Sequence, residues 1–149
     1  MLPIARRRGQ VNQDHVLLAW PSGVELWQLG PIAKKGFRKI DGVRTVIGFE
    51  YVDGNQYWLV GTTSAQLHLL SAWDIPKGTR GTPELKCLAT VNVLPSSVTR
   101  IAISAISTRA VPYRDPLSAV QLLPQAMLIV GFEDGSVRTY ILQDLFKAA

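Results

Sequence analysis

The sequence has little of what disulfide bonding, secretion or membrane insertion requires. One cysteine stands among 149 residues, so no disulfide can form within the chain, and we expect a reducing, intracellular compartment, nucleus or cytoplasm. No run reaches the eighteen or so consecutive apolar residues of a membrane helix. The N-terminal segment MLPIARRRGQ lacks the apolar stretch of a secretory signal. We therefore predict a protein that makes no membrane contact.

Motifs for catalysis and for cofactors are also missing. There is no phosphate-binding P-loop, dinucleotide glycine pattern, nucleophile elbow or paired-histidine motif. The glycine-bracketed segment Gly78–Gly81 has no following Lys-Ser/Thr, which favours a flexible loop. His15, His68 and Cys87 are widely separated and form a poor zinc set. We expect no enzyme activity, no cofactor and no metal.

Charge is sparse and biased towards basic residues. Charged residues make up 18% of the chain, and the net charge is +5. The positive charges gather in Arg6–Arg8 and in Lys34–Lys39. Such clusters suit nucleic acid, an acidic protein or a phospholipid surface, but short basic runs more often only keep a tail or an outer strand hydrated. We interpret both clusters in this second way.

What the chain does contain is an internal repeat. Three segments align with one another: His15–Leu29, Tyr57–Ser71 and Met127–Ile141. Each has an apolar run, a small residue, a short polar turn and a second run of alternating apolar residues. This pattern predicts three β-hairpins, with turns at Ser22-Gly23, Ser64-Ala65 and Asp134-Gly135. Self-similarity at a fixed period is typical of repeat architectures.

Flanking strands extend the hairpins to units of four strands, labelled a to d in chain order. Strand a precedes the second and third hairpins, and strand d follows the first and second. We predict an all-β chain of antiparallel four-stranded blades from a β-propeller, with about two and a half to three blades present. The predicted parts are a basic tail (1–14), blade b-c-d (15–40), blade a-d (43–93), blade a-c (97–142) and a C-terminal remainder (143–149).

Two insertions interrupt the repeat and are the predicted binding elements. Ala72–Pro83 is expected to connect strands c and d, and Ser104–Gln125 to contain a connection between strands a and b. Both connections lie at the same end of an antiparallel meander, so both loops project from one face. The candidate contacts for a protein partner with acidic character are Trp73, Lys77, Arg80, Arg109, Tyr113 and Arg114. An unconstrained surface insertion is the alternative.

The segments VGFEDGSVRTYIL and LAWPSGVELWQL resemble degenerate WD40 repeats, and the resemblance covers most of Val16–Leu142. Asp134 matches the turn aspartate of that family and Trp27 its strand-c tryptophan, whereas the histidine before strand a is missing. The resemblance implies a non-catalytic scaffold that binds protein partners within a larger assembly. The alternative is a nucleic-acid-associated propeller subunit of a nuclear transcription or chromatin complex, which would use the two basic clusters.

So few blades cannot close a ring, since propellers have about four to eight. We therefore expect a fragment that is completed by further blades of a longer chain or by another chain. A self-contained small sandwich is the alternative. The pair Trp73-Asp74 spells the WD dipeptide, but it falls three residues after Leu70, the position that aligns with Trp27 and Tyr140. We interpret the pair as the start of the first insertion.

Overall fold

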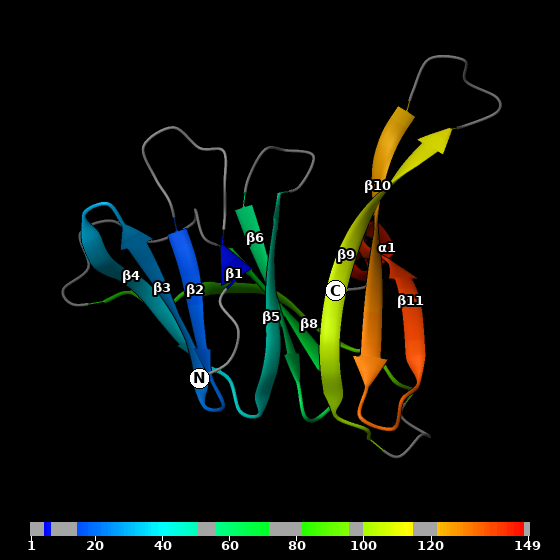
Figure 1. Ribbon diagram of the computed structural model, residues 1–149, viewed down its shortest axis with the longest axis horizontal. Coiled ribbons are helices and arrows are strands. Elements are labelled where there is room, and N and C mark those ends of the chain that lie inside the picture. The colour runs from blue at the N-terminus through cyan, green and yellow to red at the C-terminus, as the bar shows by residue number, and fades with distance from the viewer. Residues whose placement is uncertain are drawn as a thin grey trace.

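The computed structural model describes residues 5–6, 15–50, 56–71, 82–95, 100–114 and 122–147. These residues form two four-stranded sheets and one three-stranded sheet, all antiparallel (Figure 1). The predicted all-β antiparallel fold is confirmed. One short helix, α1 (Leu142–Lys147), follows the last strand.

Each sheet is a meander in which strands adjacent in sequence are adjacent in space. The first sheet contains β1 (Ala5–Arg6), β2 (His15–Trp20), β3 (Gly23–Leu29) and β4 (Ile32–Lys39). The second contains β5 (Val43–Glu50), β6 (Gln56–Thr62), β7 (Gln66–Ser71) and β8 (Lys86–Asn92). The third contains β9 (Ile103–Arg114), β10 (Leu122–Phe132) and β11 (Val137–Ile141). Strand β1 lies in the segment predicted to be a tail, and its pairing with β2 supplies a strand a to the first sheet.

The three hairpins share one register. The aligned small residues pair with the first apolar residue of the next strand: Ala19 with Val24, Gly61 with Leu67, and Gly131 with Val137. Three residues further along, Trp27, Leu70 and Tyr140 pair with Val16, Trp58 and Leu128. A register shift between strands c and d also recurs, between Leu26 and Trp27 and between Leu69 and Leu70. The alignment made on sequence alone therefore matches the strand pairing.

The hairpin turns agree with prediction in two cases and differ by one residue in the third. Gly135 and Ala65 have positive φ angles of 87° and 59°, and the Asp134 carboxylate accepts hydrogen bonds from the Ser136 N–H and hydroxyl. The first turn consists of Pro21 and Ser22, because Gly23 already pairs with Trp20. Glycine is needed at 23 because a Cβ there would lie 2.5 Å from the Arg38 carbonyl oxygen.

The sheets stack face to face, and two apolar clusters fill the spaces between them. Leu17, Leu26 and the side chains around them pack against Trp58, Val60 and Leu70 of the second sheet. The opposite face of the second sheet packs against the third through Leu59, Leu67, Leu69, Leu128 and Val130. Strand β6 is consequently buried along its whole length. In the stack, β5 contacts both β1 and β9, so the first strands of successive sheets lie beside one another.

A short segment before β8 ties the second sheet to the first. We call Pro83–Leu85 the strap. The Phe37 N–H donates to the Pro83 carbonyl at 3.1 Å, and the Leu85 N–H donates to the Phe37 carbonyl at 2.7 Å. Glu84 forms a parallel bridge with Phe37 on the free edge of β4. The Leu85 side chain is 1% exposed and fills the space beside Gly36, where a Cβ would lie 2.5 Å from its Cδ2.

Candidate interaction surfaces

The longest hairpin of the protein carries three of the six predicted contact residues. Arg109, Tyr113 and Arg114 lie on β9, and Arg109 pairs with Met127 of β10. The connection between strands a and b that was predicted within Ser104–Gln125 is shorter than this range, because β9 and β10 pair from Arg114↔Leu122 to Gly131↔Ala105. In Figure 1 this hairpin extends well beyond the ends of the other strands. Its strands hold Arg109 exposed on a β-ladder.

The other three predicted contacts, Trp73, Lys77 and Arg80, lie outside the described residues. The described end of the same predicted loop does not project: Pro83 bonds to the edge of β4. Arg38 of β4 also donates to the Leu85 carbonyl at 2.9 Å and pairs with the Glu84 carboxylate at 3.3 Å. The structure therefore uses this part of the first insertion as a connection between two sheets.

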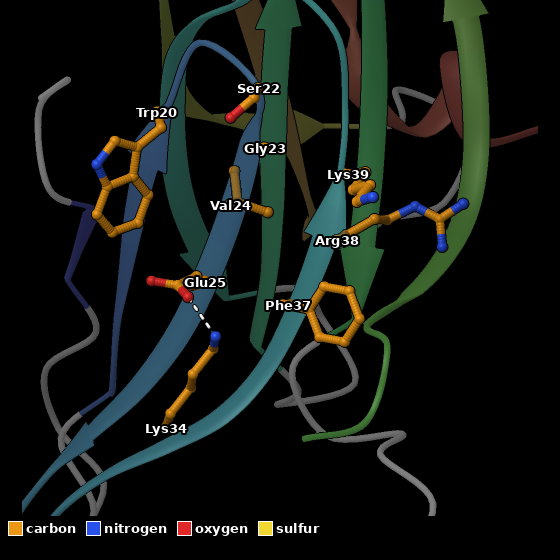
Figure 2. A pocket seen from close by; sticks show the side chains of 9 residues that line it. All are labelled: Trp20, Ser22, Gly23, Val24, Glu25, Lys34, Phe37, Arg38 and Lys39. Atoms are coloured by element: carbon orange, nitrogen blue, oxygen red, sulfur yellow. Dashed lines mark ion pairs between the residues drawn. The ribbon is translucent and has the colours of Figure 1, made fainter. Parts of the chain in front are cut away.

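A second surface, which the sequence analysis did not identify, is the outer face of the first sheet. It contains a shallow pocket of about 280 Å³ on β3 and β4. Figure 2 shows Trp20 and Phe37 on either side of an ion pair between Glu25 and Lys34. Because side chains alternate along a strand, these residues face away from the buried partners Val24 and Leu26. The pocket thus lies on the side of the sheet that no other sheet covers within the described structure.

The electrostatics of this pocket are basic. The Lys34 ammonium lies 5.8 Å from the centre of the Phe37 ring, within the range of a cation–π contact. Lys39 and Arg38 add two further positive charges, against the single carboxylate of Glu25. Arg38 is directed towards the strap, as its bond to Leu85 shows. An anionic group that enters the pocket would therefore meet Lys34 and Lys39 beside two aromatic rings.

A sequence signal for this face did exist. Lys34-Lys35-Gly36-Phe37-Arg38-Lys39 encloses an aromatic residue, and Trp20 ends the preceding strand b. Trp58 and Phe132 on strands b of the second and third sheets are 0% and 3% exposed, as expected for residues between sheets. Trp20 is only half-buried. The difference arises because, among the described residues, no further sheet covers the outer face of the first sheet. No local sequence pattern reveals this.

The surroundings of His68 lower the pKa of its imidazole below the ordinary value. Burial between the first two sheets lowers the pKa of His68, and the nearby Arg38 charge lowers it further. The ring Nδ1 lies 3.3 Å from the Thr90 hydroxyl oxygen. The neutral imidazole is therefore the form that the folded sheets favour.

This shift predicts a loss of stability in weak acid. The unfolded chain takes up a proton at the ordinary histidine pKa of about 6.5, whereas the folded chain takes it up only at lower pH. The free energy of unfolding should thus be highest above pH 6.5 and fall as the pH drops below it. Urea titrations between about pH 5 and pH 7.5 measure this slope, and His68→Gln should reduce it. An equal slope in the variant would contradict the prediction.

Neither a metal cluster nor a membrane helix is found among the residues that the structure describes. No three His, Cys, Asp or Glu side chains lie together there in an arrangement that could hold an ion. Over the same residues, no helix has the length and apolar character needed to cross a bilayer. Cys87 is half-buried on β8, and its thiol lies 3.4 Å from the Ala89 carbonyl oxygen. Comparison of the chain with protein-family models, curated proteins and solved structures finds no match in any of the three.

Proposed function

We propose that this chain is part of a WD40-like β-propeller and acts as a non-catalytic scaffold for protein partners in a larger assembly. The observation that carries the proposal is the repeated sheet. The three hairpins share one register, and the sheets stack face to face. The first strands of neighbouring sheets lie together, as expected where blades are arranged around a central axis. Closure of such a ring requires further blades.

The partner surface that we propose is the β9–β10 hairpin with the predicted contacts around it. Binding residues are commonly placed on segments that project from a rigid scaffold. The base of the hairpin is anchored in the core, since Ile103 and Leu128 are 0% exposed. The predicted contacts Lys77 and Arg80 lie outside the described residues, whereas the outer part of the hairpin carries Arg109 and Arg114. These cations suit a protein partner with acidic side chains.

Removal of the outer hairpin should abolish partner binding without unfolding the protein. Residues 110–126 would be replaced by Asn-Gly, which joins the paired residues Arg109 and Met127 through a tight turn. We expect the affinity of the shortened protein for its specific partners to fall at least about tenfold. Quantitative co-purification of the tagged full-length protein from its own cells gives the partners, and titration of a purified partner gives the affinity.

The matched control substitutes a surface residue away from the hairpin. Ile32 is 75% exposed at the start of β4, and Ile32→Ser should leave the same partners bound. Far-UV circular dichroism checks that both variants keep their sheets. If the shortened protein binds every partner as tightly as the control does, the hairpin is not the interaction surface and the proposal fails.

A nucleic-acid-associated function is the second candidate, and one observation favours it. The basic residues of β4 lie beside Trp20 and Phe37, and basic side chains combined with aromatic rings suit single-stranded nucleic acid. A fluorescent oligonucleotide titrated at low and high salt separates the two candidates. Affinity that falls steeply with salt and is reduced by Lys34→Ala and Lys39→Ala supports nucleic acid. Absence of binding at low salt excludes it.

A further inference from the structure

The three described sheets are stacked in chain order, so the two faces of each sheet are not equivalent. The forward face is directed at the following sheet, and the backward face at the preceding sheet. Forward positions are Leu17 and Ala19 in the first sheet, Leu59 and Gly61 in the second, and Ile129 and Gly131 in the third. Backward positions are Val16 and Leu18, Trp58 and Val60, and Leu128 and Val130. Both contacts within the chain join a forward face to a backward face.

Two faces of the stack have no counterpart in the described structure. One is the backward face of the first sheet, which holds Trp20, Phe37 and the pocket. The other is the forward face of the third sheet, which holds Ile129 and Val137. One is a backward face and the other a forward face. The contacts between the first and second sheets and between the second and third sheets join this same combination of faces.

The position of Val137 shows what the third sheet lacks. In the shared register, Val24 and Leu67 occupy the same position in the first and second sheets. Each of them is 2% exposed because the following sheet covers it, whereas Val137 is 63% exposed. Val137 is thus an exposed apolar side chain at a position that is buried in the two sheets that have a following sheet. A β-branched residue there fits the same kind of contact that Val24 makes.

We propose that a second copy of this chain covers these faces, with the forward face of the third sheet of one copy on the backward face of the first sheet of the other. This proposal rests on the propeller architecture of the proposed function and names one partner of it. Two copies bring together six of the described sheets, a number within the range of about four to eight blades at which propellers close. The contact is heterologous, and two copies make it twice when the ring closes.

The first test is the mass of the 149-residue chain in solution. Sedimentation velocity and light scattering over about 1 to 100 µM should show a species of twice 16.4 kDa that dissociates on dilution. A chain that stays at 16.4 kDa over this whole range overturns the proposal. Larger assemblies that grow with concentration would also overturn it, because they indicate an open head-to-tail chain.

Two single substitutions then test whether the pairing joins two different faces. Val137→Lys places a charge on the forward face of the third sheet, and Trp20→Lys places one on the backward face of the first. Each should raise the dissociation constant at least about tenfold, because an added charge without a partner is costly to bury in a protein contact. The control is Leu88→Lys, since Leu88 is 40% exposed on β8 of the middle sheet and lies on neither free face. It should leave the mass unchanged.

Mixing the two variants provides the decisive result. In a mixed dimer the forward face of the Trp20→Lys chain meets the backward face of the Val137→Lys chain without a substitution, and the second contact carries both lysines. An equimolar mixture should therefore dimerise more tightly than either variant alone. If only one of the substitutions disrupts the dimer, or if the mixture stays monomeric, the head-to-tail pairing is wrong. If the unaltered chain forms no dimer but still binds the hairpin partners, the second copy alone is overturned. Loss of hairpin partners from an intact dimer counts against the scaffold proposal instead.

Discussion

Replacement of Trp58 by alanine is expected to lower the free energy of unfolding by about 3–5 kcal/mol. The Trp58 side chain on β6 is 0% exposed and belongs to the apolar cluster between the first and second sheets. Its ring lies against Gly48 of the neighbouring strand, where a Cβ would come within 2.7 Å of the indole. Because Gly48 has no side chain, it cannot fill the cavity that the alanine substitution leaves beside it. Since domains are typically stable by about 5–15 kcal/mol, this one change removes a large part of the total.

The matched control for this prediction is Trp58→Phe. The indole Nε1 is buried and has no hydrogen-bond partner in the described structure. Phenylalanine keeps most of the ring volume and removes this unpaired N–H group, so its cost should be clearly smaller than that of alanine. Urea unfolding followed by far-UV circular dichroism measures both variants. Equal destabilisation by alanine and phenylalanine would show that ring packing does not hold the first two sheets together.

Leu85→Ala is expected to cost about 2–5 kcal/mol, although Leu85 belongs to no strand. Its side chain enters the cluster between the first and second sheets and closes the free edge of β4 beside Gly36. Removal of the isopropyl group leaves a cavity under the strap, and the strap then loses the apolar contact that holds it on β4. We expect the amides of Phe37 and Leu85, which bond across this junction, to exchange hydrogen faster.

Glu84→Ala is the neighbouring control for the strap. The Glu84 side chain is 63% exposed, and its pair with Arg38 is 3.3 Å long. Exposed ion pairs contribute about 0–1 kcal/mol, so this substitution should change the unfolding free energy little. Native-state hydrogen exchange, read at Phe37, separates the two variants. If Leu85→Ala exchanges no faster than Glu84→Ala, the buried leucine does not hold the strap.

The hairpins were predictable because their signals are local. Asp134-Gly135 predicts a turn from the positive φ that glycine tolerates, and Gly135 has that conformation. Alternation of apolar residues fixes which side chains share a face, and the pairing of Ala19, Gly61 and Gly131 follows it. These features depend on residues a few positions apart. A single sequence therefore contains them fully.

The extension of β9 and β10 was missed because its sequence has the composition of a loop. Pro112 and Pro124 interrupt the apolar pattern, and proline normally argues against a paired strand. In the structure these two prolines lie opposite each other in the ladder. Both missing N–H groups therefore fall at the same rung, and the strands continue on either side. Such a coincidence depends on the register between distant residues.

By itself the sequence determined the three antiparallel hairpins, their shared register and two of the three turn positions, since these follow from backbone preferences and alternation over a few residues. Only the tertiary structure decided which face of each sheet is covered. Trp20 ends one strand b and Trp58 lies within another, yet Trp20 is half-buried and Trp58 is 0% exposed. Burial is a property of contacts between sheets, and those contacts join residues far apart in the chain. For the same reason the strap, the pocket beside Phe37 and the exposed Val137 are features of the stack and of no local pattern.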